Sequence, residues 1–280
     1  MRLHVIDTGN FKLDGGAMFG VVPKQIWQKT NPADSNNLCS WAMRCLLIED
    51  GDKLILVDTG IGTKQDEKFL SHYHLHGEGS LVSSIQKKGF SVEDVTDVFL
   101  THLHFDHCGG ATERVGEQIL PVFPNARYHT NADHWQWATQ PNDREKASFL
   151  KENLLPMQES GQLNFLPVSE GKSPFPQFDI EFVDGHTDKM MLPRIRYKEH
   201  TLVYMADLLP SVGHIPLPYL MAYDTRPLIT LEEKREFMQR AAREKYILFF
   251  EHDPVNECCT VHETEKGIRL ERAFPLSEIL

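Results

Sequence analysis

The chain lacks several features that would assign it to a class of protein at once. No apolar run approaches the roughly 18 residues that cross a bilayer, and the first residues, MRLHVIDTGN, lack the long apolar stretch and cleavage site of a signal peptide. The five cysteines include no C-x-x-C pair. We therefore expect a cytoplasmic protein with reduced cysteines and no membrane partner.

Positive charge is also scarce. The chain has 29 Lys and Arg residues against 40 Asp and Glu residues, a formal net charge of -11, and its basic residues are dispersed. Because phosphate binding needs clustered Lys and Arg, this balance argues against nucleic acid as a partner and leaves a small-molecule substrate as the expectation. The sequence does not fix the oligomeric state, and a homodimer is left open.

No low-complexity linker interrupts the 280 residues, so we predict one domain over residues 1–280. Helical patterns cover residues 80–89 and 231–245, the second opened by a capping box of Thr230 and Glu233. Residues 166–177, with three prolines, are predicted to form a surface connection. Five apolar segments are typical of buried strands: 54–60, 97–102, 180–186, 201–207 and 246–252. Strands mixed with helices predict a layered fold.

Histidine and aspartate, in contrast, are concentrated at particular places. The stretch THLHFDHCGG, residues 101–110, holds three histidines and an aspartate, and four of the five predicted strands end in His or Asp. Imidazole and carboxylate donors suit zinc, iron or manganese. The candidate metal donors are His102, His104, Asp106, His107, His186, Asp207 and His252.

Seven donors are too many for one tetrahedral ion, but they fit two ions that share a carboxylate. We assign His102, His104 and His186 to one ion. We assign Asp106, His107 and His252 to the other, with Asp207 as the bridge. Asp58, close to the end of its strand, is expected to orient a ligating histidine through the second ring nitrogen.

The chain resembles the metallo-β-lactamase superfamily. The resemblance rests on LILVDTGIG, on VTDVFLTHLHFDHCGG and on the later DGH, MAD and EHD, in that order, over about residues 45–255. It implies an α+β fold, a four-layer αββα sandwich with the metals at one edge of the inner sheets. The chain is most similar to the di-metal hydrolases: acyl-homoserine lactonases, methyl parathion hydrolase-like enzymes and glyoxalase II.

At three positions the chain differs from particular members of that superfamily. His104 stands where the oxygen-reducing flavodiiron relatives carry glutamate. Pro210 occupies the position at which the lactonases place a tyrosine, three residues after the bridging aspartate. The third ligand is followed by GHTDKM, where many relatives have G-H-T-P-G.

The predicted cofactors are two divalent transition-metal ions, zinc first, with iron and manganese as alternatives. Such a pair activates a shared water, so we predict a hydrolase in which a metal-bridging hydroxide attacks a small ester, lactone or related organic substrate. Asp106 and Asp207 are the predicted catalytic carboxylates. Two alternatives stay open: a metal-dependent nuclease of the same superfamily, and a non-hydrolytic metal-binding or redox protein.

Substrate contacts are expected from three segments. Met18 and Phe19, in a glycine-rich loop over residues 14–27, are predicted to line an apolar pocket. Phe105 projects from the metal loop, and His214 and Tyr223 are candidates for orienting a substrate oxygen. The other histidine-rich stretch, SHYHLHGEGS with His72, His74 and His76, is predicted to be a polar loop rather than a third metal site.

Overall fold

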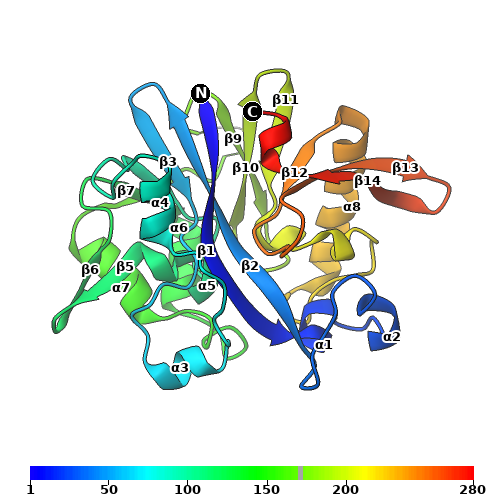
Figure 1. Ribbon diagram of the computed structural model, residues 1–280, viewed down its shortest axis with the longest axis horizontal. Helices are drawn as coiled ribbons and strands as arrows, with labels where there is room; N and C mark the ends of the chain where they lie inside the picture. Colours follow the sequence, from blue (N-terminus) through cyan, green and yellow to red (C-terminus); the bar gives the residue numbers. More distant parts are fainter. Residues whose placement is uncertain (170–172) are drawn as a thin grey trace. The chain divides into compact units, whose positions relative to one another are not determined.

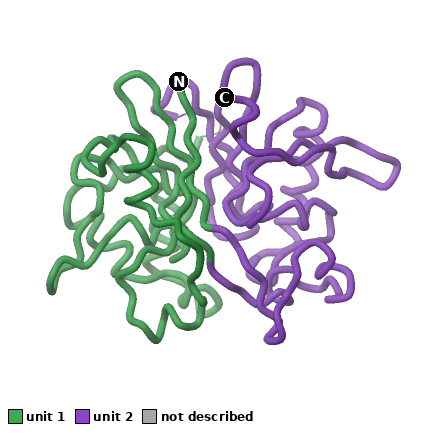
Figure 2. The backbone as a smooth tube through the Cα atoms, in the orientation of Figure 1, with its two compact units in different colours: residues 1–10, 43–169 green, residues 11–42, 170–280 purple. Residues whose placement is uncertain are grey.

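The computed structural model describes residues 1–169 and 173–280. The middle of the proline-rich connection predicted over residues 166–177 therefore lies outside the described residues. The chain divides into two compact units, which Figure 2 colours separately: unit 1 comprises residues 1–10 and 43–169, and unit 2 comprises residues 11–42 and 170–280.

Within the described residues the strands form two six-stranded sheets and one small hairpin (Figure 1). The first sheet has the order β1-β2-β3-β4-β7-β8. Its strands are β1 (Arg2–Asp14), β2 (Leu38–Asp50), β3 (Lys53–Val57), β4 (Asp97–Phe99), β7 (Arg127–Asn131) and β8 (Leu163–Leu166). The hairpin pairs β5 (Thr112–Val115) with β6 (Gln118–Pro121).

The central strands of the first sheet are parallel. β3 and β4 end level with one another, and β7 runs two residues further. Val57 of β3 pairs with Phe99 of β4, which pairs with His129 of β7. Residues 58 and 100 onward therefore leave the sheet at the same edge, which is where polar side chains can gather without disturbing the strands.

Five helices belong to unit 1: α3 (Glu67–Ser71), α4 (Leu81–Lys87), α5 (Phe105–Cys108), α6 (Ala132–Thr139) and α7 (Lys151–Glu159). A 3-10 turn, η1 (Gly109–Ala111), follows α5. Ile85 of α4, Trp135 of α6 and Met157 of α7 join Leu56 and Val98 of the sheet in one buried cluster. Burial of apolar area in this cluster holds the helices to the sheet.

The second sheet, in unit 2, has the order β14-β13-β12-β11-β10-β9. Its strands are β9 (Phe178–Val183), β10 (Met190–Tyr197), β11 (His200–Tyr204), β12 (Ile247–Phe249), β13 (Cys258–Thr264) and β14 (Gly267–Phe274). β11 and β12 are parallel and end level, Tyr204 opposite Phe249. β9 and β11 are both antiparallel to β10, so β9 runs in the same direction as β11 and β12.

Unit 2 contains α1 (Gly15–Phe19), α2 (Lys24–Trp27) and α8 (Pro227–Glu244), with 3-10 turns η2 (Ala206–Leu208), η3 (Val212–His214) and η4 (Leu276–Glu278). α8 packs on β13, and its buried residues include Phe237, Met238 and Ala241. Residues 14–27, predicted as a loop, form two short helices instead.

The helix predicted over residues 80–89 is confirmed as α4, with Ser80 as its N-cap. The capping box predicted for α8 is wrong. The helix begins at Pro227, because proline lacks the N–H that the first turn leaves unbonded, and Thr230 lies inside it.

Two expectations on composition have structural counterparts. All five cysteines are buried, and none of them forms a disulfide. Among the described residues, no helix is both long enough and apolar enough to cross a membrane.

Candidate metal centre

The predicted metal donors come from loops that follow strands, not from the strands themselves. β4, β9, β11 and β12 end at residues 99, 183, 204 and 249, and the donors His102, His186, Asp207 and His252 each lie three residues further on. The prediction that these residues end the strands is therefore wrong by three positions. β4 belongs to the first sheet, and β9, β11 and β12 belong to the second. Three residues beyond the last ladder bond give each side chain freedom to turn away from the pleat.

The metal loop is more regular than predicted. Asp106 and His107 lie on α5, a single helical turn that His104 precedes. The backbone N–H of Leu103 donates to Nε2 of His134 at 2.9 Å, and the N–H of Phe105 donates to Ser148 O at 2.9 Å. These bonds fix both sides of His104 before any ligand is considered.

The two glycines of the motif permit a close backbone approach. A Cβ atom on Gly109 would lie 2.1 Å from the carbonyl oxygen of Ile61, and one on Gly110 would lie 2.2 Å from that of Thr59. Thr59 in turn donates to His107 O from its N–H at 2.8 Å and from its hydroxyl at 3.0 Å. The loop after β3 can therefore support α5 only because residues 109 and 110 have no side chains.

Asp58 connects two of the candidate donors in unit 1. Its carboxylate accepts from the Thr101 N–H at 2.8 Å and the Thr101 hydroxyl at 2.6 Å, and it lies 3.1 Å from Nδ1 of His107. Since the Thr101 hydroxyl donates to Asp58, its oxygen accepts from Nδ1 of His102 at 3.1 Å. A buried carboxylate thus sets the proton positions of two histidines.

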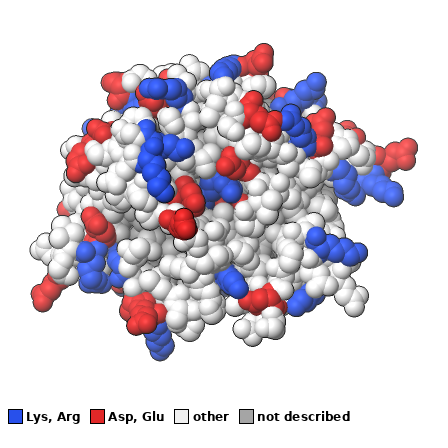
Figure 3. All heavy atoms as spheres, viewed as in Figure 1, with Lys and Arg blue, Asp and Glu red and all other residues white. Residues whose placement is uncertain are grey.

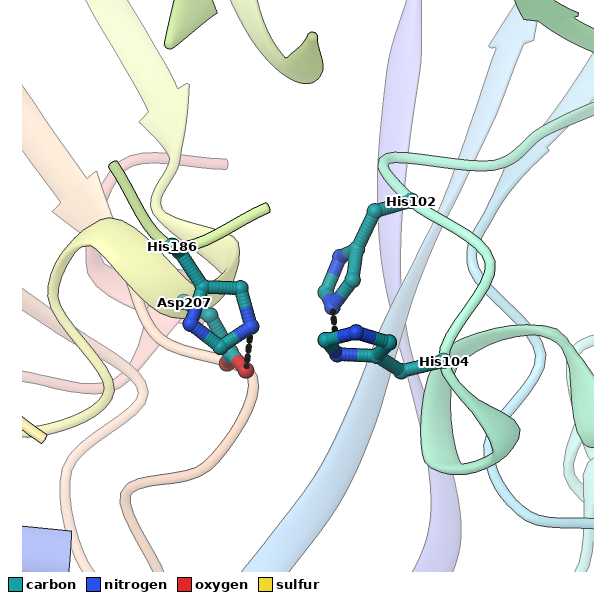
Figure 4. A group of neighbouring side chains, drawn as sticks. All are labelled: His102, His104, His186 and Asp207. Carbon is teal, nitrogen blue, oxygen red and sulfur yellow. Dashed lines mark hydrogen bonds and ion pairs between the residues drawn. The ribbon is translucent and has the colours of Figure 1, made fainter. Parts of the chain in front are cut away.

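His104 is held from its other ring nitrogen. Nε2 of His104 lies 3.4 Å from a carboxylate oxygen of the buried Glu145, which also accepts from the indole N–H of Trp137 at 2.7 Å. Nδ1 of His104 lies 3.1 Å from Nε2 of His102, the contact drawn as a dashed line in Figure 4. Two donor atoms bound to one tetrahedral ion stand roughly 3.3 Å apart, so this separation fits a shared cation.

In unit 2 each carboxylate oxygen of Asp207 lies close to a different imidazole. Oδ2 of Asp207 lies 3.0 Å from Nε2 of His186, as Figure 4 shows, and Oδ1 lies 3.1 Å from Nε2 of His252. The other ring nitrogens are held by acceptors: Nδ1 of His186 by Asp224 at 3.0 Å, and Nδ1 of His252 by the carbonyl of Ala42 at 2.8 Å.

The proton positions that follow favour a cation. Carboxylates and carbonyls only accept, so the outer nitrogens of these histidines carry the protons and the inner nitrogens carry lone pairs. In each unit the inner lone pairs then face one another or a carboxylate oxygen at about 3 Å. Only a positive charge among these atoms, a proton or a metal ion, makes that arrangement favourable. The donor set therefore fits divalent metals.

The pKa of His186 reflects the same electrostatics. Burial favours the neutral imidazole, but the Asp207 and Asp224 carboxylates on its two sides outweigh this effect and raise the pKa of His186 to about 10. A site that holds a proton so firmly is one in which a metal ion can take the proton's place.

Met18 and Phe19, two of the residues predicted to contact substrate, are buried in unit 2 beside His214. Phe19 stacks on His214 with ring centroids 4.3 Å apart and on Trp27 at 5.3 Å. Nε2 of His214 donates to the carbonyl of Met18 at 2.9 Å, and its Nδ1 lies 2.8 Å from the Ser211 hydroxyl. His214 therefore connects the backbone of Met18 to the Ser211 side chain through its two ring nitrogens.

Phe105 and Tyr223 differ in exposure. Phe105 is buried against Phe69 and Tyr73, with ring centroids 5.4 and 4.7 Å away. Tyr223 is 41% exposed. The histidine-rich stretch beside Tyr73 is an exposed loop: His72 ends α3, and His76 pairs through its backbone with Asn10.

Sequence reasoning proposed Asp58 as a residue that orients a histidine, but it missed three others that contact the histidines. Thr101, Glu145 and Asp224 are all buried, and only Thr101 lies within the histidine-rich motif. Thr101 could have been suspected because it directly precedes His102. Asp224 lies 38 residues from His186 along the chain, and nothing in the sequence connects the two.

The chain is similar to several known proteins. It is 22% identical over 282 residues to an N-acyl homoserine lactonase of Bacillus cereus, with 96% of each chain covered. A probable metal-dependent hydrolase from Staphylococcus aureus matches with a TM-score of 0.88 at 27% identity, over 98% of this chain and 96% of that one. AidC, a dizinc quorum-quenching lactonase, matches with a TM-score of 0.81 at 24% identity, over 98% and 95%.

These likenesses extend over nearly the whole chain, and they confirm the metallo-β-lactamase fold predicted from the sequence. The two structural relatives are described as a probable metal-dependent hydrolase and a dizinc lactonase. The model of the metallo-beta-lactamase superfamily matches residues 44–252, from within β2 to the last predicted donor, and the chain belongs to that superfamily.

Proposed function

We propose that this protein is a dinuclear metal-dependent hydrolase of small lactones or esters. Two relatives that align over most of the chain are an N-acyl homoserine lactonase and a dizinc lactonase. Family membership supports hydrolysis, and the donors described above support the metals. The proposal goes further in naming the ligand set and the substrate class.

The observation that carries the proposal is the position of the Asp207 carboxylate between two histidines. Its two oxygens lie close to the inner nitrogens of His186 and His252, 3.0 and 3.1 Å away. We assign His186 to one ion with His102 and His104, and His252 to the other with Asp106 and His107. A carboxylate whose oxygens serve different histidines is suited to bridging two ions.

Zinc is the proposed metal, because four-coordinate sites of imidazole and carboxylate suit it, with iron and manganese as the alternatives. Such a pair, when bound, polarises a substrate carbonyl and makes water a nucleophile near neutral pH. The residues of the chain do the rest. Asp106 and Asp207 contribute negative charge at the reaction centre, and we assign to Asp207 the transfer to the leaving oxygen of the proton that the attacking water gives up.

Substrate recognition is assigned to apolar walls and one phenol. Phe105, which packs against Phe69 and Tyr73, is assigned to one apolar wall. Met18 and Phe19 supply a second apolar wall, held in place by His214. Tyr223, more exposed than these, is the group proposed to hold a substrate oxygen.

Surface charge supports a small substrate over nucleic acid. On the face drawn in Figure 3, Lys and Arg side chains lie among Asp and Glu side chains. Among the described residues, Lys12 pairs with Asp34 at 2.8 Å and Arg196 pairs with Asp179 at 2.8 Å. A nuclease would need such cations to meet phosphates instead.

The test combines metal analysis with a substrate panel. Protein loaded with zinc, iron or manganese should hold close to two ions per chain, as two-metal hydrolases do. It should hydrolyse N-acyl homoserine lactones or aryl esters faster than phosphotriesters, thioesters or nucleic acid. One ion per chain under metal-replete conditions, or cleavage of nucleic acid alone, would contradict the proposal.

A further inference from the structure

Two adjacent residues of α8, Glu233 and Lys234, turn opposite charges into the interior of unit 2. Lys234 is fully buried and Glu233 is partly buried. Neither takes part in the proposed chemistry. Each binds the backbone of a different loop, and both loops carry residues of the proposed site.

Glu233 holds the loop that delivers His186. Its two carboxylate oxygens accept separate backbone N–H groups, that of Asp184 at 2.6 Å and that of Gly185 at 3.0 Å. The loop lies tightly on the helix, because a Cβ atom on Gly185 would be 2.2 Å from the backbone nitrogen of Thr230. Glu233 thereby fixes the two residues immediately before a proposed metal donor.

Lys234 holds the segment after Asp207. Its ammonium group donates to three backbone carbonyls, those of His214, of Pro216 at 3.0 Å and of Tyr219 at 2.9 Å. An ammonium has three donors, so these carbonyls use all of them. Burying a charge among neutral carbonyls is costly, and burial lowers the pKa of Lys234 to about 7 while the Asp224 carboxylate acts in the opposite direction.

The segment that Lys234 holds is the support of the apolar wall. His214 binds the carbonyl of Met18, and the N–H of Ala222 donates to Ala17 O at 2.8 Å. The φ angle of Gly20 is positive, and a Cβ there would lie 2.8 Å from the carbonyl of Leu220. Contacts therefore run from Lys234 through residues 214–222 to residues 17–20.

We propose that Glu233 and Lys234 are positioning residues with separate tasks: Glu233 sets the metal donor His186, and Lys234 sets the substrate wall of Met18 and Phe19. This inference rests on the proposed function for what the two loops do. The contacts that carry it are independent of any substrate.

The experiment compares Glu233→Gln and Lys234→Met with wild type, using Glu236→Gln on the exposed side of α8 and Lys266→Met in the β13–β14 turn as matched controls. Hydrogen exchange, metal retention against a chelator, and kcat and KM on an N-acyl homoserine lactone and 4-nitrophenyl acetate are measured for each. Should Lys234→Met fail to fold, Lys234→Gln, which can still donate from its amide, is measured in its place.

We expect Glu233→Gln to speed exchange at the amides of Asp184 and Gly185. It should also weaken metal retention about tenfold, as loss of a group supporting a metal ligand does. Lys234→Met should speed exchange at the amides of Tyr219 and Ala222 and keep the metals. It should raise KM about tenfold, the size expected from lost hydrogen bonds to a charged group, with a smaller effect on kcat.

Variants that only lower the melting temperature, with exchange in both loops, metal retention and KM as in wild type, would overturn the proposal. The same holds if both variants lose metal equally, since separate tasks would then be absent. If wild type binds metal but cleaves neither probe, the proposed function fails, while exchange and metal retention still decide the roles of Glu233 and Lys234.

Discussion

At the scale of single residues, the carboxylate of Asp207 is the most informative group of the candidate centre. It is buried, and each oxygen lies next to a different imidazole. A carboxylate in this position lowers the repulsion between two cations, because it places negative charge between them. Its removal should therefore affect the metals before the fold.

We expect Asp207→Ala to fold, to lose at least one metal ion and to lose activity by roughly a hundredfold or more, since the remaining ions would repel one another more strongly. Metal analysis and circular dichroism check the two halves of this expectation. Asp143→Ala, at an exposed position, is the control. An Asp207→Ala protein that keeps both metals and normal turnover would contradict the bridging assignment.

Tyr223 and His214 should give different kinetic effects. Tyr223→Phe is expected to slow turnover by roughly ten- to hundredfold with unchanged metal content, because a hydrogen bond to a charge-bearing oxygen is lost. His214→Ala should act on KM, because His214 binds the backbone of Met18. Steady-state kinetics on the best substrate of the panel decide the matter. If both variants keep the kcat and KM of wild type, the metals and apolar walls alone hold the substrate.

Asp97 provides a pH-dependent contribution to stability away from the metal donors. Burial alone would raise the pKa of Asp97, but hydrogen bonds from His129, Thr96 and Lys53 outweigh it and lower the pKa to about 2. The folded pKa lies below the unfolded value. The contribution, roughly 2 kcal/mol, is thus present above about pH 4 and lost as the pH falls toward 2.

Urea unfolding of wild type and Asp97→Asn between pH 3 and 7 checks this expectation. The difference in unfolding free energy between the two proteins should shrink as the pH falls. Asp143→Asn should match wild type throughout, because Asp143 is 98% exposed. A pH-independent difference for Asp97→Asn would show that packing rather than ionisation is responsible.

At the scale of elements, α5 depends on the loop after β3. Asp58 of this loop accepts from the Thr101 N–H and lies beside the His107 ring, and Thr59 donates to the His107 carbonyl. The loop also packs directly on Gly109 and Gly110. The position of Asp106 and His107 is thus set by contacts between backbones, which allow little adjustment.

Gly109→Ala should therefore shift α5. A methyl group 2.1 Å from Ile61 O cannot be accommodated without backbone movement, and we expect a loss of about 1–3 kcal/mol in stability together with weaker metal binding. Thermal unfolding and metal content are measured. Gly116→Ala, in an open turn with positive φ, is the control: it should cost stability through backbone strain but leave the metals unchanged.

At the scale of the whole molecule, β1 and β2 each contribute residues to both compact units. The boundaries at residues 10–11 and 42–43 fall inside these strands and not in linkers. Unfolding one unit alone would require breaking each strand in the middle of its ladder. The prediction of one domain over residues 1–280 can therefore be tested by measuring how the protein unfolds.

We expect a single cooperative unfolding transition for the metal-free protein. Tryptophan fluorescence and far-ultraviolet circular dichroism should give the same midpoint, and the calorimetric and van't Hoff enthalpies should agree. Trp41 lies in the unit 2 part of β2, and Trp135 and Trp137 lie in unit 1, so both units contribute to the fluorescence. Two separated transitions would contradict the single-domain prediction.

The sequence by itself determined the kind of fold and the chemistry of the candidate centre. Strand-like segments each followed by His or Asp, and a ten-residue stretch with three imidazoles, are local patterns that survive without knowledge of the partners. The same patterns carry the family, which the comparisons confirm. Strand ends were predicted three residues late, because apolar residues continue beyond the last ladder bond into the buried loops.

Only the tertiary structure decided which groups orient the histidines and what α8 binds. Asp224 lies 38 residues from His186, and Glu233 lies 49 residues from Asp184, so no local spacing relates them. Local propensity predicted that Glu233 would cap its own helix, yet it binds another loop. The reason is physical: buried N–H groups at residues 184 and 185 need an acceptor, and the packing of α8 brings one within 3.0 Å.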